Sequence, residues 1–207
     1  MKTEIKVIIF DWGNVLTQKS SNDSLYTFFK TSFRIDHAEL KLVLDDSEFQ
    51  TITLRKTAKE FWNEFASKKN IILPSIWFEN LEKEKIACVA HKLNLEMIDL
   101  IKQLKINGYR VVMFSNIIKE MAALIRKAGH YAHFEDAILS CEIGYSKPNP
   151  KAYDILLSRI NAKPFECMFI DDKKENIRAA QEKGIQGIVF QSFKDLKTQL
   201  DKNLIKY

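Results

Sequence analysis

A short apolar run that ends at an acidic residue, close to the start of the chain, most constrains its fold. Residues 7–10 are β-branched or aromatic (Val-Ile-Ile-Phe), and Asp11 and Gly13 follow them. A run of this length and composition predicts a buried strand of a parallel sheet. Open α/β sheets bind ligands beyond the carboxyl ends of their strands, so we expect Asp11 at a ligand site. The signal is weak alone, because many strands end in Asp to begin a turn.

Four more apolar runs of similar length follow, and segments with helical spacing separate them. Strands are predicted at residues 5–10, 110–114, 136–139, 167–170 and 187–190. Helices are predicted from about residue 94 to Asn107–Gly108 and at 121–127, 150–160, 174–183 and 192–204. Strands that alternate with helices are typical of α/β proteins. The sequence therefore predicts a Rossmann-like fold, in which a parallel sheet of five strands carries helices on both faces.

Residues 18–90 differ in character from the rest of the chain. They contain no glycine and one proline, and aromatic residues recur there at helical spacing. We therefore predict a small helical domain at 18–90, inserted into a core formed by 1–17 and 91–207. Trp62 and Trp77 are expected in the apolar interior of this insertion rather than in a ligand site.

Composition limits the classes of function. A chain of 207 residues with 46% hydrophobic residues can bury the core of one ordinary domain plus an insertion. The net charge of +5 comes from basic residues mixed with acidic ones, so nucleic-acid binding is not expected. The sequence has neither the apolar core of a signal peptide nor an apolar run of about 18 residues, so we expect a cytoplasmic protein that does not enter membranes.

The cysteines and histidines give little sign of a metal site. Cys88, Cys141 and Cys167 are odd in number and widely spaced, which argues against a disulfide framework or zinc and predicts packed, reduced thiols. His130 and His133 lie three residues apart without a further ligand nearby, so surface or core positions are expected for both.

Polar side chains recur where the predicted strands end. Ser115 follows one strand, Asp171 and Asp172 follow another, and Lys147 lies in a loop with prolines. Singly, each has an ordinary explanation: a helix cap, a turn, or a solvated lysine. Together with Asp11 they predict a site in which acidic oxygens bind Mg²⁺ while a lysine and a hydroxyl bind an anion. That combination suits phosphoryl transfer, with a carboxylate attacking phosphorus.

Four segments of the chain resemble the motifs of the haloacid dehalogenase-like (HAD) hydrolase superfamily. They are residues 10–16 (FDWGNVL), 114–116 (FSN), 140–153 (SCEIGYSKPNPKAY) and 169–172 (FIDD), the last continued by 175–180 (ENIRAA). The helical insertion is similar to the superfamily's C1-type cap. The D-x-G-N-V form of the first motif most resembles sugar-phosphate phosphatases and the N-terminal phosphatase domain of epoxide hydrolases.

This resemblance implies a role for each matching residue. Asp11 would be the nucleophile and form an aspartyl-phosphate, Ser115 would hydrogen-bond a phosphoryl oxygen, and Lys147 would offset negative charge. Asn176 stands where many relatives have a second acid, which implies a weaker or indirect contribution to metal binding. The implied substrate-binding residues are Asn14, Ser115, Asn116 and Lys147. The implied Mg²⁺ ligands are Asp11, the backbone carbonyl of Gly13, Asp172, and Asp171 as a ligand or as an orienting neighbour.

Gly13 is a departure from the resembled pattern. Most phosphatases of the superfamily have an Asp there, which protonates the leaving group and later activates water. Loss of such a general acid and base typically costs ~10²–10⁴ in rate. Three hypotheses therefore stay open: a Mg²⁺-dependent phosphatase, a metal-independent 2-haloacid dehalogenase, and a non-catalytic protein that binds phosphate.

The predicted helical insertion also bears on the partners of the protein. A lid of this kind shields a site from water and excludes macromolecules, so a small phosphorylated metabolite is the expected substrate. Lys19, Arg34, Arg55 and Lys56 are candidate cations of the insertion that would face this substrate. A monomer and a weak homodimer are both compatible with the sequence.

Overall fold

The computed structural model describes residues 4–17, 24–36, 38–40, 43, 56–90 and 93–207. Backbone contacts divide the chain into two compact units. The first, which we call the sheet unit, comprises Met1–Gln18, Leu93–Asn116 and Gly129–Tyr207. The second, which we call the helical unit, comprises Lys19–Lys92 and Ile117–Ala128.

A parallel sheet of five strands forms the centre of the sheet unit. The strands are β1 (Val7–Phe10), β2 (Arg110–Ser115), β3 (Asp136–Leu139), β4 (Cys167–Asp171) and β5 (Gln186–Val189). Their order is β3-β2-β1-β4-β5, and all neighbours are parallel. The predicted α/β fold with five strands is thus confirmed. The strand order reverses between β1 and β4, which is where open α/β sheets bind ligands.

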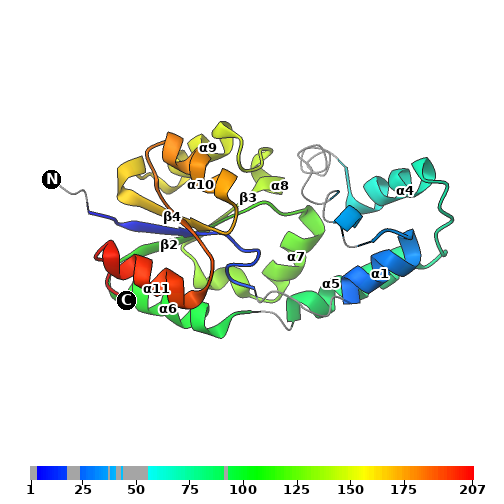
Figure 1. Ribbon diagram of the computed structural model, residues 1–207, viewed down its shortest axis with the longest axis horizontal. Helices are drawn as coiled ribbons and strands as arrows, with labels where there is room; N and C mark the ends of the chain where they lie inside the picture. The colour runs from blue at the N-terminus through cyan, green and yellow to red at the C-terminus, as the bar shows by residue number, and fades with distance from the viewer. Residues whose placement is uncertain (1–3, 18–23, 37, 41–42, 44–55, 91–92) are drawn as a thin grey trace. The chain divides into compact units, whose positions relative to one another are not determined.

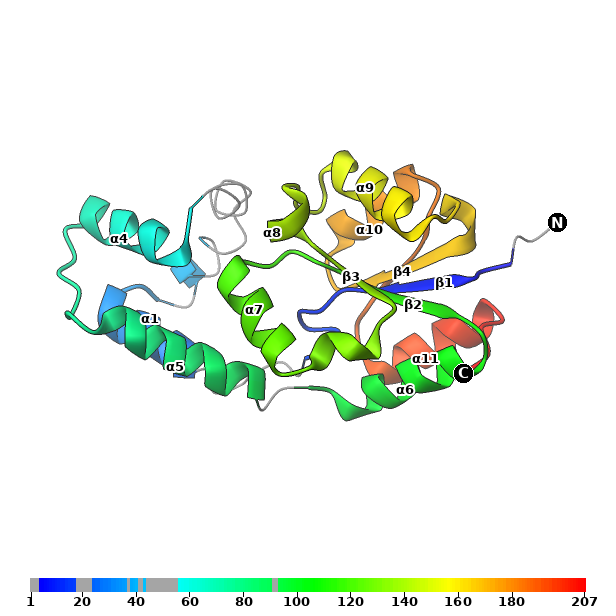
Figure 2. The same cartoon turned by 180° about the vertical axis from the view of Figure 1, so that it is seen from behind.

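Helices cover both faces of this sheet, with α9 and α10 on one face and α6 and α11 on the other (Figures 1 and 2). The α-helices of the sheet unit are α6 (Leu95–Ile106), α8 (Ser140–Ile143), α9 (Pro150–Ile160), α10 (Lys174–Glu182) and α11 (Phe193–Lys202). Two 3₁₀ helices also belong to this unit: η1 (His130–His133) precedes β3, and η2 (Pro164–Glu166) precedes β4.

The helices of the sheet unit start and stop where the sequence contains capping residues. Asn149 caps α9 by accepting a hydrogen bond from the Lys151 N–H, and Pro150 occupies the first turn, where its missing N–H costs nothing. Ser192 caps α11, and Gly108 follows α6 with a φ of 89°.

The helical unit contains α1 (Ser24–Phe33), α4 (Ala58–Lys68), α5 (Trp77–Ala90) and α7 (Lys119–Lys127). Its core is aromatic: the Trp62 ring lies 4.4 Å from that of Phe29 and 5.1 Å from that of Phe33. Trp62 and Trp77 are both buried, which confirms their predicted place in an apolar core.

The position of α7 differs from the predicted division of the chain, which placed residues 91–207 in one core. Two contacts explain why α7 groups with the helical unit instead. The Glu120 carboxylate accepts a hydrogen bond from the Ala58 N–H at 3.0 Å, and Ile118 packs against the aromatic core.

The described cysteine side chains, His130 and Lys56 lie in different surroundings. Cys141 and Cys167 are free thiols, as expected. His130 lies against the Trp12 ring, with centroids 5.9 Å apart. Lys56 pairs with Glu64 at 2.6 Å, whereas Lys19 and Arg55 fall outside the described residues, as does the Cys88 side chain.

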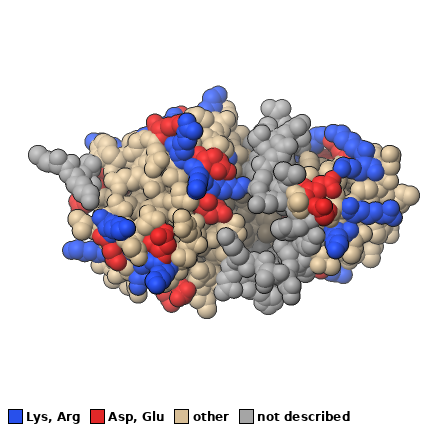
Figure 3. Space-filling view, viewed as in Figure 1, with Lys and Arg blue, Asp and Glu red and all other residues tan. Residues whose placement is uncertain are grey.

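The surface of the sheet unit carries charges of both signs (Figure 3). Acidic and basic side chains are interspersed on the visible face of the sheet unit (Figure 3). Within the described residues, no helix has both the length and the apolar character needed to cross a bilayer.

Candidate active site

Asp11 lies at the carboxyl end of β1, in the middle of the sheet. Its N–H donates to the Ile170 carbonyl at 2.9 Å, so the residue continues the ladder between β1 and β4. The side chain is nearly buried, and its Oδ1 accepts a hydrogen bond from the Lys147 ammonium at 2.7 Å. Burial raises the pKa of Asp11 to about 6; Lys147 opposes this rise, and the neighbouring Asp171 adds to it.

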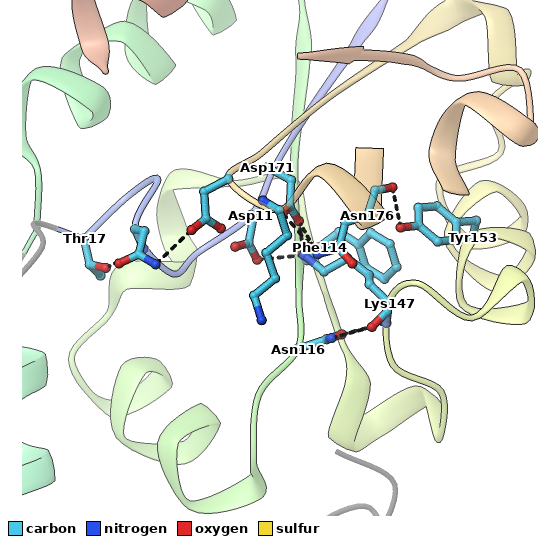
Figure 4. A network of polar contacts seen from close by, with 11 residues as sticks. Asp11, Thr17, Phe114, Asn116, Lys147, Tyr153, Asp171 and Asn176 are labelled. Atoms are coloured by element: carbon cyan, nitrogen blue, oxygen red, sulfur yellow. Dashed lines mark hydrogen bonds and ion pairs between the residues drawn. The ribbon is translucent and has the colours of Figure 1, made fainter. Parts of the chain in front are cut away.

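Lys147 is a buried cation with three hydrogen-bond acceptors. Its Nζ donates to Asp11 Oδ1, to Asp171 Oδ2 and to the Phe114 carbonyl, each at 2.7 Å (Figure 4). The Phe114 and Phe169 rings lie with their centroids 5.1 Å from this ammonium. Burial opposes the charged form, but the two carboxylates outweigh it and raise the pKa of Lys147. Lys147 is therefore charged and held in place, unlike a solvated lysine.

Asp171, the last residue of β4, is fully buried, and both of its oxygens accept hydrogen bonds. Oδ1 accepts from the Lys173 N–H at 2.8 Å and Oδ2 from Lys147. Asn176 Nδ2 lies 3.1 and 3.0 Å from the two oxygens. Burial raises the pKa of Tyr153, so its hydroxyl stays protonated and donates to the Asn176 carbonyl at 2.8 Å. This network gives Asp171 the character of an orienting residue.

Asp172 is the more accessible member of the acidic pair. Its Oδ2 accepts a hydrogen bond from Asn14 Nδ2 at 2.9 Å. Asn14 itself has a φ of 57°, in the left-handed region that Asn tolerates better than most residues, and its N–H donates to Thr17 Oγ1 at 3.1 Å. The turn after β1 thus aims the Asn14 carboxamide at Asp172.

The three carboxylates are close enough to bind one cation. One oxygen from each of Asp11, Asp171 and Asp172 lies within 4.8 Å of the others. Hard divalent cations prefer such all-oxygen sites, and Lys147 offsets only one of the three negative charges. The donor set therefore fits Mg²⁺.

Ser115 and Asn116 lie at the carboxyl end of β2. Ser115 is the last residue of the strand and is buried, so it is not a helix cap. Both polar atoms of the Asn116 side chain bond to the backbone of Lys147: Nδ2 donates to its carbonyl and Oδ1 accepts from its N–H, each at 2.8 Å. Sequence reasoning assigned Asn116 to the substrate, and no pattern in the sequence indicated a partner in the loop of Lys147.

Gly13 lies in the turn after β1. Among the described residues other than its two chain neighbours, a Cβ added to Gly13 would meet one heavy atom within 4 Å, the Oδ2 of Asp11 at 3.9 Å. None of these residues therefore blocks the first atom of the Asp side chain that is usual at this position.

The chain is similar in sequence to several known hydrolases. Over 70 residues, or 34% of this chain, the sequence is 36% identical to mouse bifunctional epoxide hydrolase 2, of which it spans only 13%. It spans less than a quarter of the rat and pig enzymes as well. It is 24% identical to D-ribitol-5-phosphate phosphatase of Bacteroides thetaiotaomicron, covering 88% of this chain and 90% of that protein.

A solved structure and a family model also match most of the chain. A HAD family enzyme from Bacteroides thetaiotaomicron, solved with magnesium and inorganic phosphate, superposes with a TM-score of 0.71 and is 23% identical. The match covers 93% of this chain and 98% of that one, which shows a shared fold. The family model of the haloacid dehalogenase-like hydrolases matches residues 5–184. The chain therefore belongs to the haloacid dehalogenase-like hydrolase family.

Proposed function

We propose that this protein is a Mg²⁺-dependent phosphatase that hydrolyses the phosphate monoester of a small metabolite through an aspartyl-phosphate on Asp11. The observation that carries this proposal is the buried pairing of Asp11 with Lys147, beside Asp171 and Asp172, where the strand order reverses. The relatives named as sugar-phosphate phosphatases support the choice of substrate class.

In the first step, an oxygen of Asp11 attacks phosphorus, and the bond from phosphorus to the ester oxygen breaks. The leaving group departs with that electron pair and takes a proton from water or from the phosphate, because Gly13 has no acid to give. Lys147 offsets charge shared by Asp11 and the phosphoryl group, and the Ser115 hydroxyl donates a hydrogen bond to a phosphoryl oxygen. Water then attacks phosphorus, which releases inorganic phosphate and restores the Asp11 carboxylate.

Asp11, Asp172 and the carbonyl of Gly13 are the residues that would hold Mg²⁺, with Asp171 orienting the site through Lys147. When bound, Mg²⁺ would neutralise part of the charge of the phosphate. Asn14 would then act chiefly by orienting Asp172, to which its carboxamide donates.

The helical unit is the part to which we assign substrate selection. We propose that it acts as a cap, which limits the enzyme to small metabolites in the cytoplasm. The predicted cap was residues 18–90; the grouping of α7 with this unit extends the proposal to 117–128.

The test is release of phosphate from p-nitrophenyl phosphate and from D-ribitol 5-phosphate, with Mg²⁺ and with EDTA. Asp11→Asn is the inactive variant, and Asp99→Asn, the same change at an exposed residue of α6, is the matched control. Release that requires Mg²⁺ and disappears only in Asp11→Asn supports the proposal. Turnover of a haloacid in EDTA would indicate a dehalogenase instead, and binding of inorganic phosphate without any turnover would indicate a non-catalytic protein.

A further inference from the structure

The two hydrogen bonds between Asn116 and Lys147 suggest a function for Asn116 other than binding substrate. A carboxamide carries the same donor and acceptor as a peptide group. Here it pairs with the N–H and the carbonyl of one residue, as two residues of an antiparallel ladder do (Figure 4). The Asn116 side chain thus adds one pair of hydrogen bonds beyond the end of β2.

In the segment that carries Lys147, the other backbone hydrogen bonds between described residues are local. It connects α8 with α9, and its hydrogen bonds from Gly144 N–H to Ser140 and from Asn149 N–H to Ser146 stay within this connection and its flanking helix. In the described part of the chain, both hydrogen bonds of the Lys147 backbone go to Asn116.

The same strand end also holds the other end of the lysine. Lys147 Nζ donates to the carbonyl of Phe114, two residues before Asn116. The end of β2 therefore fixes both the backbone and the ammonium of Lys147, and β2 is the direct neighbour of β1, which ends at Asp11. The position of the cation relative to Asp11 is thus set by two adjacent strands.

We infer that Asn116 is a positioning residue that holds the Lys147 ammonium against Asp11 and Asp171. This inference rests on the proposed phosphatase function, in which Lys147 offsets charge at the phosphoryl group. Because both of its polar atoms are engaged by Lys147, Asn116 acts on the reaction through that lysine. A neutral carboxamide does this without adding charge to a site that already holds three carboxylates.

The first measurement is hydrogen exchange of the Lys147 backbone amide in Asn116→Ala and in Asn116→Asp. Asn116→Ala removes both hydrogen bonds, whereas Asn116→Asp keeps an acceptor for the Lys147 N–H and loses the donor to its carbonyl. Exchange at Lys147 is expected to accelerate by at least about fivefold in Asn116→Ala and by less in Asn116→Asp. Asn149→Ala is the matched control, since Asn149 lies in the same connection and caps α9 without bonding to Lys147.

The second measurement is steady-state kinetics with p-nitrophenyl phosphate in Mg²⁺. If Asn116→Ala displaces the Lys147 ammonium, kcat should fall by about 10- to 100-fold, because misplacing a reacting group by ~1 Å can lower the rate by ~10²-fold. KM should rise as well, by about three- to tenfold, because the ammonium also pairs with the phosphoryl group of the bound substrate. Asn149→Ala should leave kcat within about twofold even though it weakens the helix cap.

The third measurement is a double-mutant cycle of Asn116→Ala with Lys147→Ala, followed by the Kd of inorganic phosphate in Mg²⁺. If Asn116 acts through Lys147, the double variant binds phosphate as Lys147→Ala does. Additive losses, or unchanged exchange at the Lys147 amide in Asn116→Ala, would overturn the inference. A wild-type protein without phosphatase activity would overturn the proposed function, while the exchange and phosphate-binding results would still decide the role of Asn116.

Discussion

Gly13→Asp should convert the protein into a faster phosphatase for esters with poor leaving groups. The change puts a carboxyl group where most related phosphatases have their general acid. Among the described residues other than its chain neighbours, the added Cβ has Asp11 Oδ2 as its one contact within 4 Å, at 3.9 Å, and Gly13 is not among the residues with positive φ. The backbone therefore accepts a side chain without strain, and replacement of glycine should itself add ~0.4–1 kcal/mol of stability.

The magnitude follows from the distance between the new carboxylate and Asp11. Two negative charges ~5 Å apart repel by ~3 kcal/mol at an effective dielectric constant of ~20. This repulsion raises the pKa of the new carboxyl above its ordinary value. A raised pKa keeps the carboxyl protonated in a larger fraction of molecules near neutral pH, so that it can donate a proton to the leaving oxygen, which is typically worth ~10²–10⁴ in rate.

The assay compares kcat/KM for an alkyl phosphate, such as D-ribitol 5-phosphate, with that for p-nitrophenyl phosphate. Nitrophenolate leaves without a proton, so its rate should change by less than about tenfold, whereas the alkyl ester should gain at least ~10². Gly13→Asn has nearly the same shape but no proton to give and serves as the control. An equal gain in Gly13→Asn, or an equal gain for both esters, would refute the argument that a missing acid limits the enzyme.

Three further predictions concern the charged groups of the site. Lys147→Met should lower the free energy of unfolding by ~3–5 kcal/mol in urea, because it leaves Asp11 and Asp171 buried without their cation; a loss below ~1 kcal/mol would show that the pair relaxes into solvent. In EDTA, burial raises the pKa of Asp11 from 3.8 to about 6 in the folded state, so between these pH values the folded state binds a proton that the unfolded state has lost. The contribution of Asp11 to the free energy of unfolding should therefore be greatest below pH ~4 and should fall by ~3 kcal/mol as the pH rises through ~6. Urea titrations at several pH values should show this dependence in the wild type and not in Asp11→Asn. Asp172→Asn should weaken Mg²⁺ binding, measured by calorimetry, by at least about tenfold, whereas Asn14→Ala should weaken it less; equal affinity in Asp172→Asn and the wild type would remove Asp172 from the metal site.

The five strands of the sheet could be predicted from the sequence because each is a short apolar run that ends where polar or turn-forming residues begin. The same ends placed Asp11, Ser115 and Asp171 correctly at one edge, since parallel strands share the direction of their carboxyl ends. The assigned catalytic, substrate-binding and metal-binding roles stay predictions.

Contacts between distant segments were beyond the reach of sequence patterns. The partner of Asn116 lies 31 residues away, in a connection whose path depends on the packed helices around it. Likewise, the periodicity of residues 121–127 predicts a helix but does not show which core it joins. The burial that sets the pKa of Asp11 is a property of the assembled sheet.

The central position of β1 has a consequence for how the chain acquires its structure. β1 precedes both of its neighbouring strands in the chain, and both lie far from it in sequence: Val7 pairs with Arg110 and with Cys167. Lys6, just before it, bonds to Glu166 across a sequence separation of 160 residues. Asp11 at the end of β1 can therefore meet Lys147 only after the chain has been made as far as that residue, 136 positions later. Until β2 has been made, the apolar segment of β1 has no partner strand from its own sheet and must be kept from pairing with other chains.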